Sequence, residues 1–198
     1  MRTFCVLFVT ILSLCIGIQG INVEGEIVQG ENVKFVAKHW DITTEDVTIT
    51  SINGKEASFY GDKKVTYLDI LDQTVHYLPK GIENFFPLLE KLSIVGSELN
   101  SVKSDNLKPF VHLQTVNLKN NKITTLDSNV FEFNPEITTL WMSRNNLKHI
   151  GADILTPLKK LTYADFSANE CVDKLIDEEG SETVDFSTLV NEFKTKCA

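Results

Sequence analysis

Five segments of this chain share one pattern of apolar residues, and their starts are spaced 24 residues apart. In each segment the first, fourth, sixth and eleventh positions are apolar, with a cysteine at the eleventh position of the last copy. A unit of this length cannot bury its apolar face alone, so the repeat predicts a solenoid in which neighbouring units stack. The segments start at Val65, Leu89, Leu113, Ile137 and Leu161.

The ninth position of each segment is polar. Positions 4 and 6 alternate as the inward side chains of a short strand would, so position 9 falls at the turn that follows the strand. An amide there can bond backbone groups that no apolar side chain satisfies. Gln73 and Ser97 replace asparagine in the first two segments, which predicts a looser ladder at that end. The structural turn ladder is expected from Asn121, Asn145 and Asn169.

The pattern L-x-x-L-x-L-x-x-N-x-L resembles the leucine-rich repeat family, at the length typical of its extracellular members. The resemblance extends over about residues 47–198 and implies an α/β solenoid, or horseshoe, with capped ends. Five repeats over 65–170 would place short parallel strands on the concave face and irregular or helical segments on the convex side. The convex segments should fill the space between coils with Phe85, Phe86, Phe110, Phe131, Phe133, Leu155 and Leu158.

Residues 1–20 are expected to be a secretory signal peptide. Arg2 supplies the positive start, residues 4–18 form an almost unbroken apolar run, and Gly17 or Gly20 offers a small residue for cleavage. The alternative is a membrane span, but the run is shorter than the ~18 to 20 residues that a bilayer requires. We therefore expect a secreted, extracellular protein without a membrane span.

Residues 21–64 are expected to form an amino-terminal arm and a cap. The stretch VKFVAKHW fits an edge strand, and residues 21–46 are either an extra strand or an extended arm. Asn53-Gly54 is a hairpin signal. The segment around it can equally be aligned as a shortened coil with Val47, Thr50 and Ile52 inward.

Residues 171–198 are expected to form a helical carboxyl-terminal cap. Loss of the leader leaves only Cys171 and Cys197, and two cysteines in an oxidising compartment most simply form one disulfide. Leu189, Val190 and Phe193 have helical spacing, and either Asp185 or Ser187 is a candidate cap for that helix.

No catalytic or metal-binding motif is present in the sequence. Asp69 and Asp165 are the best carboxylate pair on the strand face, but four repeats separate them by roughly 19 Å, beyond the ~5 to 9.5 Å used by glycosidases. We expect no enzyme activity, no cofactor and no metal. The histidines are interpreted as surface or loop residues: His39, His76, His112 and His149.

The charge balance bears on the choice of partner. The chain has 19 basic and 27 acidic residues, and loss of Arg2 with the leader would bring the net charge from −8 to about −9. An acidic protein is poorly suited to bind DNA, RNA or an anionic membrane. A protein or a microbial or matrix ligand is therefore the expected partner.

The concave face offers the candidate ligand site. Trp141 lies between the inward Leu140 and Met142, so its indole must point outward. An aromatic anchor ringed by polar groups is typical of a binding hot spot. The alternative is that Trp141 lies flat on Tyr163 and only covers backbone, while Leu71 and Val95 extend an apolar patch. The candidate ligand-binding residues are Trp141, Tyr163, Lys119, Asn117, Arg144, Asp165, Tyr67 and Lys91.

The sequence thus favours a secreted, non-enzymatic recognition protein that binds its ligand on the concave face. It is similar to small secreted leucine-rich repeat proteins of insects, some of them immune, so innate immunity is one option. Two alternatives remain open. One is an inhibitor that occupies the active site of an enzyme, and the other is an adhesion or matrix protein that self-associates.

Overall fold

The computed structural model describes residues 19–30, 32–60, 64–177 and 185–198. The expected leader therefore lies outside the described residues except for Gln19 and Gly20, which begin strand β1 (Gln19–Val28). A cut after Gly17 would leave the whole of β1 in the mature chain, whereas a cut after Gly20 would remove its first two residues.

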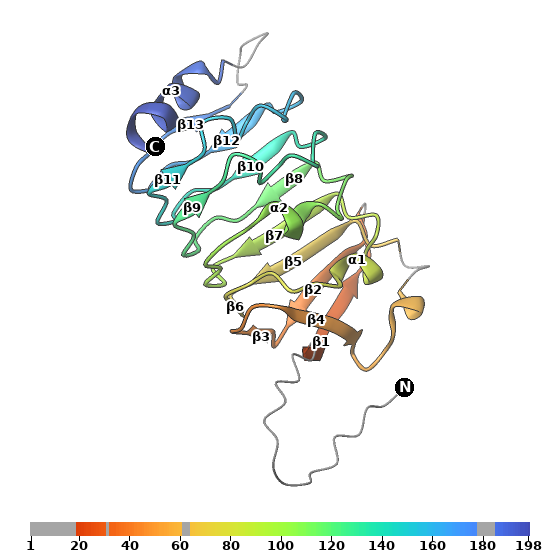
Figure 1. The fold of residues 1–198 in the computed structure, drawn as a ribbon. Coiled ribbons are helices and arrows are strands. Elements are labelled where there is room, and N and C mark those ends of the chain that lie inside the picture. The colour runs from red at the N-terminus through yellow and green to blue at the C-terminus, as the bar shows by residue number, and fades with distance from the viewer. Residues whose placement is uncertain (1–18, 31, 61–63, 178–184) are drawn as a thin grey trace, which may run out of the picture.

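The repeats form one parallel sheet whose strands stack side by side along the molecule (Figure 1). Within each pair of neighbouring repeats the strands align without a shift, so the fourth positions Leu68, Leu92, Val116, Leu140 and Ala164 are in register. This confirms the predicted solenoid. The strands are β5 (Tyr67–Leu71), β7 (Lys91–Val95), β8 (Thr115–Asn117), β10 (Thr139–Trp141) and β12 (Tyr163–Asp165).

The inward side chains at positions 4 and 6 of all five repeats are almost completely buried; Leu92, the most exposed of them, is 1% exposed. Burial of apolar surface is the main favourable term in folding. Since each coil contributes two such side chains and rests on the next, the repeats hold one another in place.

A sixth coil precedes the five that the repeat predicts. Strand β2 (Lys34–Lys38) pairs in parallel with β5, and Phe35 lies opposite Leu68. Strand β3 (Asp41–Ile42) pairs in the same way with β6 (Thr74–Val75). The expectation that VKFVAKHW is an edge strand is wrong, because β2 lies between β5 and β1 inside the sheet.

The backbone after the strand supports the same count of coils. At position 8 of every coil the chain adopts the left-handed conformation, in which most side chains are disfavoured. The sixth coil does the same at His39. The φ angles are 56° at His39, 51° at Asp72, 61° at Gly96, 59° at Asn120, 55° at Arg144 and 54° at Ala168.

The amino-terminal end of the sheet is completed by β1 and β4 (Val47–Ile52). The second half of β1 pairs antiparallel with β2, and its first half pairs in parallel with β4. Val47 and Ile52 are buried, but Thr50 is exposed, so its predicted inward position is wrong. Thr50 instead donates its hydroxyl to the carbonyl of Ile21.

Asn53-Gly54 forms the two-residue turn that its sequence predicts. Ile52 and Lys55 exchange backbone hydrogen bonds of 2.9 and 2.8 Å across it, and both turn residues have positive φ. Residues 55–60 form no second strand, because the chain continues there into the short helix η1 (Ala57–Phe59).

The convex segments include two short helices and a small second sheet. Helices α1 (Ile82–Phe85) and α2 (Ser104–Leu107) and strands β9 (Thr125–Leu126) and β11 (His149–Ile150) lie there. Six of the seven predicted core residues are buried, but Phe133 is 36% exposed. The prediction for Phe133 is wrong because its ring lies at the surface, where the ammonium of Lys108 covers it at 4.9 Å.

The turn ladder satisfies backbone groups between coils. Asn121 accepts hydrogen bonds from the amides of Ser97 and Leu99 and donates to the carbonyls of Ile94 and Leu118. Asn145 and Asn169 bond equivalent groups in the next coils. Ser97 is fully buried, and its hydroxyl accepts the amide of Gln73 and lies within donating distance of the carbonyls of Ile70 and Val95. A hydroxyl has one donor hydrogen where an amide has two, so it bonds fewer backbone groups.

The carboxyl-terminal cap consists of β13 (Leu175–Ile176), which runs antiparallel to β12, and helix α3 (Ser187–Lys196). Figure 1 shows α3 lying across the end of the solenoid. The Phe193 ring packs 5.1 Å from that of Phe166 in the last coil. A disulfide joins Cys171 to Cys197. At the start of the helix, the Asp185 carboxylate accepts the amide and hydroxyl of Ser187.

Candidate functional site on the concave face

The concave face is defined here as the outward side chains of β2, β5, β7, β8, β10 and β12. The strand register arranges these side chains in three rows, one for each outward position. The middle row runs Val36, Asp69, Ser93, Asn117, Trp141 and Asp165.

Trp141 and Tyr163 form an aromatic pair in this face. Both side chains are half-buried, their ring centroids are 5.2 Å apart, and the ring planes meet at 52°. The indole therefore contacts the phenol ring but does not lie flat on it. A tilted pair of this kind fixes the ring positions and leaves part of each surface open to solvent.

A pocket of about 270 Å³ lies next to Trp141 on the concave face. Four of the predicted ligand residues meet there, although they come from four different strands. The pocket is lined by Tyr67, Lys91, Leu92, Ser93, Thr115, Asn117 and Trp141.

Two of the predicted ligand-binding residues already form hydrogen bonds within the chain. One carboxylate oxygen of Asp165 accepts the amide of Ser167 at 3.0 Å and its hydroxyl at 2.6 Å. Asn117 accepts the amide of Lys119 at 3.3 Å through its side-chain oxygen. Lys119 and Arg144 are exposed and do not line the pocket.

Lys34 was not among the predicted residues, because its coil breaks the 24-residue spacing. Its ammonium forms an ion pair with Asp69 and lies 4.8 Å from the centre of the Tyr67 ring. Burial lowers the pKa of Lys34, but the hydrogen bond and negative charge of Asp69 outweigh it, so the pKa lies above its ordinary value. Lys34 thereby neutralises Asp69, which lies beside the pocket residue Ser93 in the strand register, and it also contacts the Tyr67 ring.

The described residues offer no grouping for metal binding. Within residues 19–30, 32–60, 64–177 and 185–198, no three His, Cys, Asp or Glu side chains are grouped to hold a metal ion. Asp69 and Asp165 are separated by three intervening strands of the sheet. No helix in this part of the chain is long and apolar enough to cross a bilayer.

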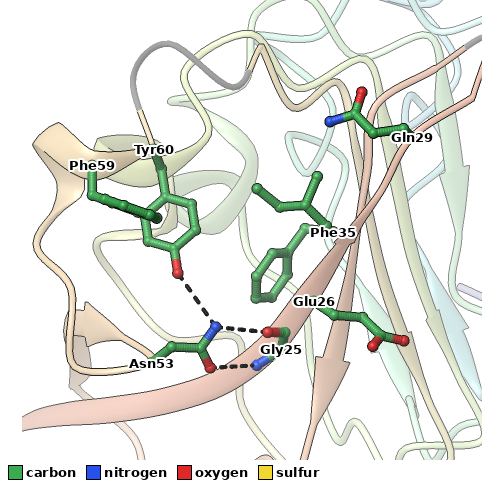
Figure 2. A pocket seen from close by; sticks show the side chains of 8 residues that line it. Gly25, Glu26, Gln29, Phe35, Asn53, Phe59 and Tyr60 are labelled. Atoms are coloured by element: carbon green, nitrogen blue, oxygen red, sulfur yellow. Dashed lines mark hydrogen bonds between the residues drawn. The ribbon is translucent and has the colours of Figure 1, made fainter.

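A second pocket, of about 350 Å³, lies beside β1 near the amino-terminal end. Figure 2 shows Asn53 bridging the amide and carbonyl of Gly25 and reaching the Tyr60 hydroxyl, while Glu26 points away. Phe35 closes the pocket against Gly25, where an added Cβ would come within 2.1 Å of the ring. The pocket is thus mainly apolar, and its Asn53 amide is already bonded.

Comparisons with known proteins agree with this architecture. The family described as leucine rich repeat matches residues 87–147 and 111–171. The human protein called leucine-rich repeats and immunoglobulin-like domains protein 2 is 23% identical over 124 residues, which cover 59% of this chain and 12% of that protein.

Two solved structures are also similar. A chain in the structure of the Toll–Spatzle complex of Drosophila has a TM-score of 0.52 and 16% identity, covering 62% of this chain and 17% of that one. A chain in the TLR13–ssRNA13 complex has a TM-score of 0.47 and 23% identity, covering 73% and 19%. This chain therefore spans less than a fifth of the length of each of these proteins.

The stacked parallel strands, the asparagine ladder and the matched repeats define a leucine-rich-repeat solenoid. The described residues contain six coils and a helical cap closed by a disulfide at the carboxyl end.

Proposed function

We propose that this chain is a secreted, non-enzymatic recognition protein that binds a protein ligand on its concave face. The observation that carries this proposal is the half-exposed Trp141–Tyr163 pair beside the concave pocket. Coil packing needs only the inward side chains, so the outward ones are free to serve a partner. Aromatic side chains next to polar groups supply most of the binding energy in many interfaces.

Secretion is supported by two separate features of the chain. The first residues have the pattern of a signal peptide. The Cys171–Cys197 disulfide suits an oxidising compartment. Expression of the full sequence in an insect or mammalian cell line, followed by sequencing of the amino terminus from the medium, tests secretion and locates the cut.

A protein ligand is favoured over a nucleic acid by charge. The chain carries a formal net charge of −8, and two of the lysines on the concave face are paired with carboxylates. Nucleic-acid affinity depends on several cations that replace counterions along the phosphate backbone. Innate immunity is one setting for such a protein, in line with the resemblance to small secreted insect proteins.

Affinity capture from the extracellular fluid of the source tests the proposal. The mature protein is run beside Trp141→Ala, and circular dichroism verifies that the variant is folded. We expect a partner that wild type retains and the variant loses. A captured hydrolase would identify an inhibitor, and mass that rises with protein concentration would identify self-association. A partner that both proteins retain equally would place the site elsewhere.

A further inference from the structure

The lining of the concave pocket contains hydrogen-bond donors and no carboxylate. Lys91 contributes an ammonium, and Ser93 and Thr115 contribute hydroxyls. Because the side-chain oxygen of Asn117 already accepts the amide of Lys119, its NH₂ group remains as a donor at the pocket. The polar groups of the pocket are therefore suited to an acceptor that bears negative charge.

The ion pairs of the concave face leave Lys91 without a counter-ion. Lys34 is paired with Asp69, and Lys38 is paired with Glu26 at 2.7 Å. Among the ion pairs between described residues, none includes Lys91. An acidic chain that neutralises the neighbouring lysines and leaves this one uncompensated has a cation available for a partner.

The surroundings of Lys91 would strengthen an ion pair between its ammonium and a ligand. Its strand register places it between Tyr67 and Thr115, and its side chain is half-buried. Trp141 forms another part of the pocket wall. A ligand that fills the pocket would exclude water from the ammonium, and an ion pair is stronger in such a site than at an open surface.

We infer that the concave pocket binds an aspartate or glutamate side chain of the protein partner. The carboxylate would accept hydrogen bonds from the Lys91 ammonium and the Asn117 amide, while Trp141 packs against the partner's adjacent apolar atoms. This inference rests on the proposed function and adds the chemical class of the group that is recognised. It makes Lys91 the residue that selects for an acid and Trp141 the residue that anchors the partner.

A single carboxylate fits the pocket better than a polyphosphate chain. The next cations, Lys119 and Arg144, do not line the pocket, so no continuous basic track leads from it. On the amino-terminal side of Lys91, Lys34 and Lys38 are already paired with Asp69 and Glu26, so neither offers a free cation to a second phosphate.

Selection of binders from a displayed library of random peptides tests the inference without knowledge of the natural partner. Selected peptides are resynthesised with each Asp or Glu replaced by Asn or Gln, and their Kd values are measured against four proteins. These are wild type, Lys91→Gln, Trp141→Ala and a matched control, Lys159→Gln. Lys159 is exposed on the convex side, and the control removes the same charge as Lys91→Gln.

We expect the peptides that need Trp141 to share an acidic residue. Lys91→Gln should weaken their binding by about tenfold or more, the usual effect of losing a charge-assisted hydrogen bond. Replacing the acidic residue of the peptide by its amide should weaken binding to wild type by a similar factor. The same change should weaken binding to Lys91→Gln little further. Lys159→Gln should bind like wild type.

Three results would overturn the inference, and they can be told apart. Peptides that need Trp141 but lack an acid, or bind Lys91→Gln as well as wild type, would overturn the carboxylate site and leave the proposed function intact. Peptides that bind Trp141→Ala as tightly as wild type would overturn both. If a single-stranded RNA oligonucleotide binds more tightly than the peptides and its binding depends on Lys91, the group recognised by the pocket is a phosphate and not a carboxylate.

Discussion

Phe35 lies directly beside Leu68 in the parallel ladder between β2 and β5, and both side chains are completely buried. Phe35 also contacts Phe86 from the first convex segment, with ring centroids 4.9 Å apart. The amino-terminal segment is therefore a full coil of the solenoid, and its core is continuous with that of the five regular repeats.

Replacement of Phe35 by alanine should lower the free energy of unfolding by about 3 to 5 kcal/mol, because it leaves a cavity in the core of this coil. Chemical denaturation followed by circular dichroism measures the change. The control is Val28→Ala, since Val28 is 44% exposed in the neighbouring strand and should change stability little. Equal, small effects of both variants would mean that residues 32–60 are a loosely attached arm.

The sequence predicts the regular coils because positions 4, 6 and 11 recur at a fixed spacing. The fixed spacing does not predict the sixth coil, because Phe35 precedes Leu68 by 33 residues instead of 24. The extra length accommodates β4, the Asn53-Gly54 turn and η1. Phe35, Ala37 and Ile42 still have the spacing of positions 4, 6 and 11. That spacing within the coil is the feature of the sequence that indicates it.

The candidate site is predictable to a similar degree. Alternation in the strands places Trp141, Asn117 and Lys91 on one face, and the register brings them to one pocket. The Lys34–Asp69 ion pair could not be foreseen, since Lys34 belongs to the unrecognised coil. The hydrogen bonds that occupy Asp165 are also local details that periodicity does not specify.

Replacement of Asn121 by alanine should destabilise the protein by at least about 3 kcal/mol. The change removes the partners of two amides and two carbonyls between coils, and each unsatisfied buried group costs ~1 to 3 kcal/mol before relaxation. Denaturant unfolding measures it. Asn146→Ala is the matched control, because that side chain is exposed and should alter stability by less than about 0.5 kcal/mol. A similar loss in both variants would contradict a structural ladder.

Removal of the disulfide should release the carboxyl-terminal cap before the coils unfold. The bond closes a loop with a sequence separation of 26, which stabilises by about 3 to 4 kcal/mol on the chain-entropy model. In the double variant Cys171→Ala with Cys197→Ala, amide hydrogen exchange should speed up first in α3. Unchanged protection of α3, with β10 as the internal reference, would show that packing of Phe193 alone retains the helix.

The start of α3 should lose stability in acid. Hydrogen bonds from the hydroxyl and then the amide of Ser187 hold the pKa of Asp185 below its ordinary value of 3.8. Because the folded pKa is lower than the unfolded one, the contribution of Asp185 is complete above the unfolded value and disappears as the pH falls through the folded one.

Asp185→Asn isolates the effect of titration, since its side-chain oxygen can still accept the amide of Ser187 but the side chain does not titrate. Unfolding of both proteins is compared at about pH 5 and about pH 2.5, on either side of the ordinary pKa of an aspartate. We expect the stability of wild type relative to the variant to fall between these two values. A constant difference at both pH values would show that Asp185 does not stabilise the helix through its charge.

The most direct test of a ligand site on the concave face is the affinity of the captured partner for two aromatic variants, measured by titration calorimetry. Trp141→Ala removes the anchor from the concave face, and Phe133→Ala removes an exposed ring from the convex side. We expect Trp141→Ala to weaken binding by at least about 2 kcal/mol, as at a hot spot, and Phe133→Ala to leave the Kd unchanged. A Kd that changes only with Phe133→Ala would contradict this expectation and locate the ligand on the convex side.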